Sequence, residues 1–243
     1  MSQFSKSSRR NFLQNTLLGT AIASTTSVQA EAPANAAAAE ITNEVDVLVV
    51  GGGTAGTIAA IQAGRAGASV LLVERGSQLG GTMTTGGVAF PGLFDAWGKQ
   101  VIAGIGWELV KDCVELDQGP FPDFSKVPQK HWHNQVFINM FTYALLAEEK
   151  CGQAGVQIAY YEFPQAVTKT EAGWQVDCVG FGTQRRVHCK QIIDCTGGAE
   201  VAGLLGLPRL REEERQPGSY LFMLGAAHEP GRDQIHQIGR AHV

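Results

Sequence analysis

The sequence lacks the cysteine patterns that bind metals. Its five cysteines are Cys113, Cys151, Cys178, Cys189 and Cys195, and no two of them have the C-x-x-C spacing. A zinc site, a redox dithiol or an iron–sulfur cluster is therefore not expected. The cysteines are interpreted as small buried apolar residues, and no metal site is predicted.

Long apolar runs and an excess of positive charge are also absent. The longest apolar run near the N-terminus, residues 17–23, is interrupted by Gly19 and Thr20 and is far shorter than the roughly 20 residues of a membrane span. The chain has 19 basic and 23 acidic residues, a net charge of −4, which disfavours nucleic-acid binding. The composition, 44% hydrophobic and 17% charged, predicts a soluble globular protein without stable membrane insertion.

The N-terminus has the features of an export signal. An arginine pair, Arg9 and Arg10, stands in a segment, residues 1–30, that contains no acidic residue and ends in the small-x-Ala sequence of residues 28–30. These features predict a signal similar to twin-arginine signals, followed by an Ala-rich linker over residues 31–43. The export machinery is then a partner, and the location is periplasmic or extracellular. The alternative is a basic tail with an accidental arginine pair.

A strand, a glycine turn and a helix follow one another after the linker. Residues 45–50 are mostly valine and leucine, which is typical of a strand buried on both faces of a parallel sheet. The turn G-G-G-T-A-G occupies residues 51–56, and residues 57–66 have helical periodicity. Residues 69–73 predict a second buried strand that ends at Glu74. Glycine spacing alone is a weak signal, but this order is that of a βαβ unit.

Each residue type in this unit suits a dinucleotide. Gly51 permits the sharp turn, Gly53 lets backbone amides approach a pyrophosphate, and Gly56 lets the helix pack closely on the sheet. The helix N-terminus favours an anion. Glu74 can accept hydrogen bonds from both ribose hydroxyls of an adenosine, and an acid there disfavours the 2′-phosphate of NADP. The alternative is the same tight turn without a ligand.

Residues 45–87 and 192–206 resemble the FAD-dependent oxidoreductases of the glutathione-reductase-like fold. Within that family they are similar to the group related to the flavin core of heterodisulfide reductase. With the intervening chain, the resemblance covers about residues 44–225. It implies FAD as the cofactor and the following contact residues: Gly51, Gly53, Thr54, Ala55, Gly56, Glu74, Arg75, Gly80, Gly81, Thr82, Thr85, Val167, Thr196 and Gly197.

The segment between the two resembling stretches favours FAD over NAD. Residues 165–190 predict three short antiparallel strands, and Trp174, Val176 and Cys178 alternate along one of them. A flavin fold needs such a β-meander between its parallel strands, whereas a simple NAD domain would have another helix. The predicted fold class is therefore α/β: a Rossmann-like FAD-binding domain, residues 44–205, whose parallel sheet carries an inserted β-meander.

The chain departs from the family pattern at two places. Family members usually carry Thr-Gly-Asp where this chain has Thr196, Gly197 and Gly198, after a predicted strand over residues 192–195. An acidic contact or cap near that turn is expected to be missing unless Glu200 replaces it. The cysteine runs that bind clusters in heterodisulfide reductases are also absent, so no iron–sulfur ligands are expected.

Two helices are predicted between the βαβ unit and the meander. Asn134 is expected to cap the second helix, which continues through Phe137 to near Gly152 and whose broad apolar coverage predicts a buried position. Apolar residues at steps of three and four predict the first, amphipathic helix: Ile102, Ile105, Leu109, Cys113 and Leu116.

Residues 206–243 are expected to begin a substrate domain that is truncated at its C-terminal end. Flavoproteins of this fold usually return to the sheet near their C-terminus, and the sequence up to Val243 has no such closing segment. Residues 238–243 also match what one reading frame of a common sequencing adapter encodes. The last residues are therefore expected to be artefactual.

The leading functional hypothesis is an FAD-dependent oxidoreductase that acts on a small-molecule substrate and passes electrons to an acceptor. Two alternatives stay open: an NAD-dependent dehydrogenase and a non-catalytic flavin-binding electron carrier. His131 and His133 could donate a proton or be ordinary surface residues. The sequence does not choose between these roles, so no catalytic residue is assigned.

Overall fold

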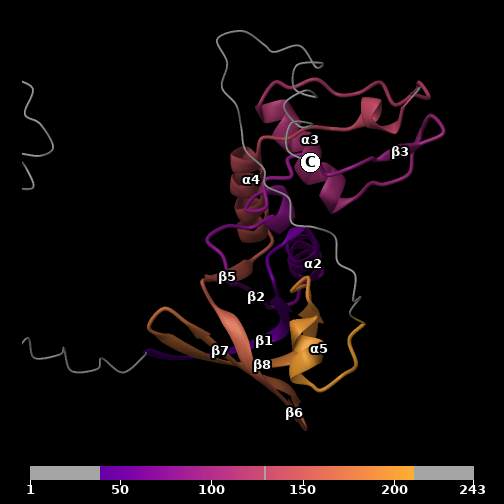
Figure 1. Ribbon diagram of the computed structural model, residues 1–243. Coiled ribbons are helices and arrows are strands. Elements are labelled where there is room, and N and C mark those ends of the chain that lie inside the picture. Colours follow the sequence, from indigo (N-terminus) through magenta and orange to yellow (C-terminus); the bar gives the residue numbers. More distant parts are fainter. Residues whose placement is uncertain (1–38, 129, 211–243) are drawn as a thin grey trace, which may run out of the picture. The chain divides into compact units, whose positions relative to one another are not determined.

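The computed structural model describes residues 39–128 and 130–210 (Figure 1). Three predicted segments lie outside these residues: the export signal, most of the linker, and the second domain beyond residue 210, including its last residues. Among the residues that are described, no helix is both long enough and apolar enough to cross a membrane.

The described chain contains one large sheet whose strand order is β5-β2-β1-β8-β7-β6. The parallel strands are β1 (Ala39–Val50), β2 (Val70–Glu74), β5 (Val156–Tyr160) and β8 (Thr183–Asp194). The antiparallel strands are β6 (Phe163–Thr170) and β7 (Gly173–Gly180), which connect to β8. This topology confirms the predicted α/β sheet with an inserted β-meander.

Strand β1 begins at Ala39, inside the segment that was predicted as linker. Its first half pairs with the first half of β8, from Ala39 opposite Thr183 onward, and its second half lies between β8 and β2. Strand β8 is continuous where two separate strands were expected. One strand therefore belongs both to the meander and to the parallel sheet.

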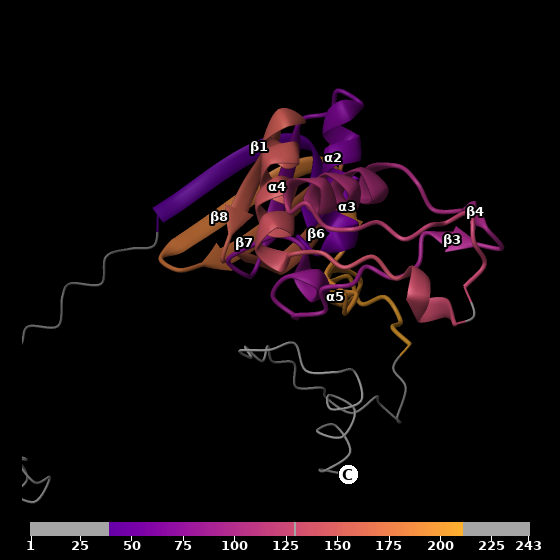
Figure 2. The same cartoon turned by 90° about the horizontal axis from the view of Figure 1, so that it is seen from above.

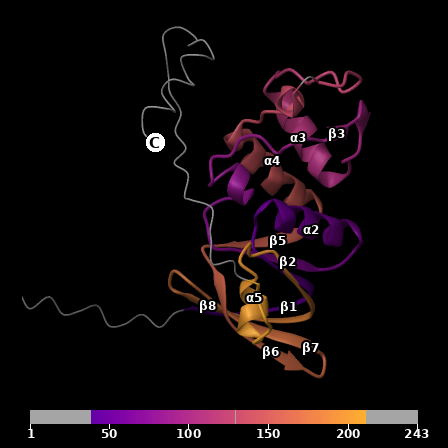
Figure 3. The same ribbon diagram turned by 45° about the vertical axis from the view of Figure 1, so that its right-hand side comes forward.

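The two faces of the sheet are covered differently, as alternating side chains require. Val49 and Leu72 face a core shared with α2 (Thr54–Arg65), α3 (Ile105–Leu116) and α4 (Met140–Gln153). Their neighbours Leu48 and Leu71 face the meander and α5 (Glu200–Leu204). In Figure 3, α2, α3 and α4 lie above the strands, and α5 lies apart from them.

A long excursion connects β2 to α4. It contains the short helix η1 (Gly81–Met83), the two-stranded hairpin of β3 (Asp95–Ala96) and β4 (Lys99–Gln100), helix α3, and the short helix η2 (His131–Asn134). The hairpin lies at the end of this unit opposite the start of β1 (Figure 2). The ring of Trp107 packs against three others and holds these loops on α3: Phe94 at 4.9 Å, Phe121 at 5.8 Å and Phe124 at 5.7 Å between centroids.

The prediction that Asn134 caps the second helix is wrong. The cap of α4 is Asn139, whose side chain accepts hydrogen bonds from the backbone N–H groups of Phe141 and Thr142 at 3.0 and 3.4 Å. Asn134 is buried and donates to the Asp95 carboxylate at 2.8 Å. The buried position expected for this helix from its broad apolar coverage holds for one face only: Tyr143 is buried, but Phe141 is 67% exposed.

A buried ion pair fastens the start of β8 to the start of β6. The Arg185 guanidinium donates to both carboxylate oxygens of Glu162, at 2.7 and 2.9 Å, and also donates to the Asn43 side chain. The two charged side chains are only 13% and 6% exposed. The pair therefore joins β1, β6 and β8 at one place.

We predict that Arg185→Met lowers the free energy of unfolding by about 3 kcal/mol, because the Glu162 carboxylate would be left buried without a cation. The matched control is Arg186→Met on the same strand. Its pair with Asp177 is half exposed, so its loss is expected not to exceed about 1 kcal/mol. Urea denaturation of both variants measures this difference, and equal losses would contradict the prediction.

Candidate functional site

The glycine turn after β1 brings backbone segments too close together for side chains. Gly51 has φ of +98°, and a Cβ there would lie 2.4 Å from the Cys195 carbonyl oxygen. A Cβ on Gly56 would lie 1.7 Å from the Gly51 carbonyl oxygen. The chain needs glycine at both positions so that α2 can approach the ends of β1 and β8.

The N-terminus of α2 is open to a ligand. Its N-cap residue is Gly53, so no side chain hydrogen-bonds the first free N–H groups, and its first turn contains no acidic residue. A Cβ built on Gly53 would meet no atom within 4 Å. The unpaired N–H groups and the positive end of the helix dipole therefore face space in which an anion fits.

A second glycine-rich segment lies against this turn. Gly80 pairs with Gly53 in a parallel bridge, and the Gly80 N–H donates to the Gly52 carbonyl at 2.9 Å. A Cβ on Gly81 would lie 2.9 Å from the Gly53 Cα, which explains why a glycine stands there too. Helix η1 is thereby held beside the N-terminus of α2.

Glu74 stabilises the turn through both of its carboxylate oxygens. One accepts the Gly52 N–H at 2.6 Å, and the other accepts the Gly76 N–H at 2.6 Å. Each oxygen can accept a further hydrogen bond, because an ionised carboxylate has about four acceptor sites. The carboxylate therefore shapes the turn and can still accept hydrogen bonds from a ligand.

Asp194 supplies an acid at the turn where the family pattern was expected to lack one. Its carboxylate accepts from the Thr196 N–H at 3.1 Å, the Thr196 hydroxyl at 2.7 Å and the Ala202 N–H at 3.1 Å. Burial alone would raise the pKa of Asp194, but these hydrogen bonds outweigh it and lower the pKa. Glu200 instead pairs with Arg209 at 3.1 Å.

Sequence reasoning missed this role of Asp194. The signal was present, because an aspartate in the last position of a strand, two residues before a Thr-Gly turn, can accept the N–H groups that follow it.

These elements surround a cavity of about 980 Å³, a size typical of cofactor sites. The open end of α2, the Glu74 carboxylate and the turn held by Asp194 all border it, so the residues present fit an extended phosphate-bearing ligand. The predicted contact residues on its wall are Gly51, Gly53, Thr54, Ala55, Glu74, Arg75, Gly81, Thr82, Thr85, Thr196 and Gly197.

Three predicted contact residues do not line the cavity. Gly56 and Gly80 support its walls through the close backbone contacts described above. Val167 lies on β6 and packs against the core on the meander side of the sheet. The part of this region that borders the cavity comes earlier in the chain, at residues 162–164.

Neither histidine of η2 is among the described residues that border the cavity. His133 is exposed, and the side chain of His131 lies outside the described part of the structure. Within that part, no three His, Cys, Asp or Glu side chains group as metal ligands. Of the cysteines, only Cys195 borders the cavity, where partial burial raises the pKa of its thiol.

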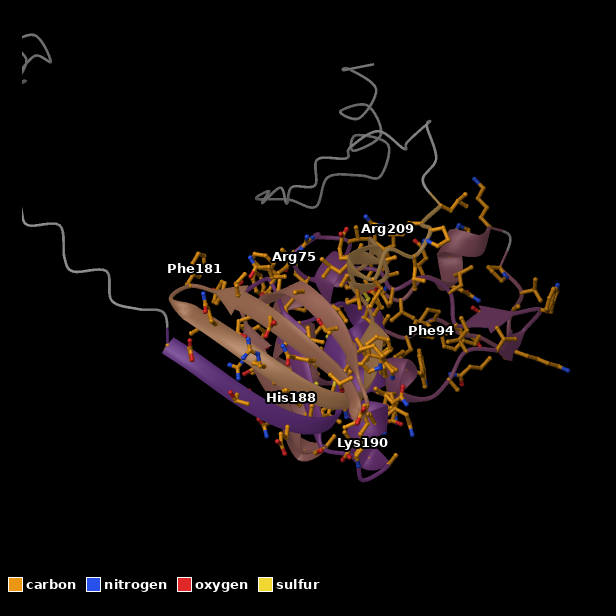
Figure 4. All side chains as sticks on the ribbon, turned by 90° about the horizontal axis from the view of Figure 1, so that it is seen from below. Arg75, Phe94, Phe181, His188, Lys190 and Arg209 are labelled. Atoms are coloured by element: carbon orange, nitrogen blue, oxygen red, sulfur yellow. The ribbon has the colours of Figure 1, made fainter. Side chains whose placement is uncertain are left out.

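A second cavity of about 430 Å³ lies where β2 begins, away from the carboxyl ends of the strands, beside His188 and Lys190. In Figure 4 these two residues lie at the lower side, and Arg75 and Arg209 lie at the upper side. Lys190 forms an ion pair with Asp46 at 2.6 Å, and the hydrogen bonds from Lys190 and Ser69 lower the pKa of Asp46.

The sheet topology and the large cavity define a dinucleotide-binding domain of the type with an inserted meander. Residues 46–239 match the family described as FAD dependent oxidoreductase. The chain therefore belongs to this family, and its cofactor is FAD.

A curated relative and two solved structures are similar to parts of the chain. The chain is 50% identical to the FAD-dependent oxidoreductase dpchF of Colletotrichum higginsianum over 86 residues. These residues make up 35% of this chain and 16% of that protein. OxyS anhydrotetracycline hydroxylase from Streptomyces rimosus has 20% identity and a TM-score of 0.47, over 67% of this chain and 34% of the hydroxylase. p-Nitrophenol 4-monooxygenase PnpA from Pseudomonas putida has 16% identity and a TM-score of 0.47, over 68% of this chain and 43% of the monooxygenase.

We predict that Gly56→Ala lowers the free energy of unfolding by about 3 kcal/mol or more, because the new methyl group overlaps the Gly51 carbonyl oxygen and no flexible side chain can yield. The control is Gly152→Ala in α4, where a Cβ meets nothing within 4 Å. There the higher helix propensity of alanine should raise stability by up to about 1 kcal/mol. Thermal and urea unfolding measure both effects, and a stable Gly56→Ala protein would refute the packing argument.

Proposed function

We propose that this protein is an oxidoreductase that binds FAD in the large cavity, with the pyrophosphate at the N-terminus of α2 and the adenosine ribose at Glu74. The observation that carries the proposal is the placement of this uncapped helix end beside the Glu74 carboxylate. The helix end favours a diphosphate, and the Glu74 carboxylate accepts hydrogen bonds from ribose hydroxyls. FAD contains both partners.

The protein's own residues bind and orient the cofactor. The N–H groups at the start of α2 bind the pyrophosphate, and Thr82 and Thr85 offer hydroxyls along the same wall. The turn of Thr196 and Gly197 forms another part of the wall, and Asp194 holds it by accepting hydrogen bonds from Thr196. When bound, FAD supplies the chemistry, accepting a hydride or electrons from a small-molecule substrate and passing them to an electron acceptor.

The finer family relations stay predictions. The chain spans 16% of the curated relative that it matches, so the substrate and electron acceptor of the whole protein belong to the proposal. Relation to the flavin core of heterodisulfide reductase, and truncation of a second domain, also stay predictions. The described residues contain no cysteine group that would hold an iron–sulfur cluster.

Export is a further part of the proposal. It is supported by the arginine pair Arg9 and Arg10 and by the small-x-Ala sequence at residues 28–30. A twin-arginine route carries folded proteins, which suits a protein that takes up its cofactor before export. The proposed location is the periplasm or the extracellular space.

We predict that the 243-residue chain binds FAD at least about 100-fold more tightly than FMN, because FMN lacks the adenosine whose ribose donates two hydrogen bonds to Glu74. Flavin fluorescence titration measures both affinities. ADP should compete with FAD, since it has the adenosine and the diphosphate.

Three outcomes would contradict the proposal. Equal affinity for FAD and FMN would exclude recognition of the adenosine. Binding of NAD in preference to FAD would favour the NAD-dependent dehydrogenase. Stable flavin binding without bleaching by any substrate in an anaerobic screen would favour a non-catalytic electron carrier.

The export proposal predicts that residues 1–43 carry a folded reporter protein across the membrane of a bacterium that has the twin-arginine machinery. Replacing Arg9 and Arg10 together by lysine should abolish this transport, because the pair is what that machinery recognises. Cell fractionation measures the outcome. Transport that is unchanged by the double substitution would exclude the twin-arginine route.

A further inference from the structure

Tyr143, the largest fully buried side chain among the described residues, has an unsatisfied polar atom. The residue lies on the inner face of α4 and is 0% exposed. Among the described residues its hydroxyl has no hydrogen-bond partner. A buried polar group without a partner is unfavourable, and native structures contain few of them. The phenol therefore needs an explanation that packing alone does not give, since a phenylalanine would fill the same space.

The hydroxyl lies beside the ligand-binding end of α2. Burial is the main cause that raises the pKa of Tyr143, the Cys113 thiol adds to it, and the Thr54 hydroxyl acts in the opposite direction. Thr54 is thus a close neighbour of the phenol, although no hydrogen bond of ordinary geometry joins them. The Cys113 thiol is already directed to the Asn139 carbonyl at 3.5 Å.

Thr54 connects this buried region to the cavity. It is the first residue of α2, it borders the cavity, and its hydroxyl donates to the Gly80 carbonyl at 3.3 Å. That hydrogen bond is long and correspondingly weak. A phosphate oxygen at the helix end would be a stronger, charged acceptor for the same hydroxyl proton. Once Thr54 donates to a phosphate, its oxygen can accept a hydrogen bond from the phenol.

We infer that Tyr143 is a positioning residue for the pyrophosphate: its buried hydroxyl donates to Thr54 when Thr54 donates to the phosphate. The two hydroxyls then form a chain that ends on a negative charge, and each hydrogen bond in such a chain strengthens the next. Tyr143 thus favours the liganded state without contacting the ligand.

This inference rests on the proposed function, and the test uses FAD and ADP as probes with the 243-residue chain. Tyr143→Phe should weaken binding of both probes by about 3- to 10-fold, the effect of one hydrogen bond. The unfolding midpoint of the ligand-free variant should be unchanged or higher, because the substitution removes only an unsatisfied hydroxyl. A purely structural tyrosine would show the reverse pattern.

A double-substitution cycle tests whether the effect passes through Thr54. Thr54→Val removes the hydroxyl at nearly constant volume and should weaken binding by itself. Adding Tyr143→Phe to Thr54→Val should then cause no further loss. Losses that multiply would overturn the inference, because they would mean that the two residues act independently.

The matched control is Thr142→Val, which removes a hydroxyl from the neighbouring residue of α4. That hydroxyl donates to Asp117 at 2.9 Å, and Thr142 is not among the residues that border the cavity. The affinity of this variant for FAD should equal that of the unchanged protein. If the unchanged protein binds FAD but Tyr143→Phe binds it equally well, the inference alone is wrong. If the unchanged protein binds neither FAD nor ADP, the proposed function is wrong and this inference falls with it.

Discussion

The rest of the structure depends on backbone contacts that leave no room for side chains around the glycine turn. The carbonyl oxygen of Gly51 touches Gly56, Gly51 itself touches Cys195 directly after β8, and Gly81 touches Gly53. Two carboxylates, on Glu74 and Asp194, then accept the N–H groups of these tightly packed turns. Because the segments that follow β1, β2 and β8 meet here, the shape of the cavity depends on the arrangement of these three strands.

Much of this arrangement could be predicted from local sequence. The valine-rich run before the glycines allows little besides a buried parallel strand, and Gly51, Gly53 and Gly56 stand at the spacing that the turn needs. The meander was also predictable, because alternating residues such as Val176 and Cys178 mark one buried face. These features depend on neighbours within a few residues, which a single sequence displays.

The features that could not be predicted depend on distant partners. Asn134 and Asn139 both precede the apolar run of α4, and only the position of Asp95 decides that Asn134 is buried instead of capping the helix. The early start of β1 depends on the first half of β8, since its alternating polar residues resemble a linker until that partner is present. Val167 was expected at the cavity from the family resemblance, and the sequence does not show how far β6 is offset from the cavity.

Strand β8 has one more consequence, which concerns the order of folding. The hydrogen bond between Asn43 and Arg185 joins residues 142 positions apart, and the wall formed by Thr196 and Gly197 comes later still. Contacts of such long sequence separation form slowly, because closing a long loop costs chain entropy before any pairing compensates for it. During synthesis, the βαβ unit leaves the ribosome well before the segment with Thr196 and Gly197, which completes the wall of the cavity. Cofactor capture is therefore a late event that follows the docking of β8.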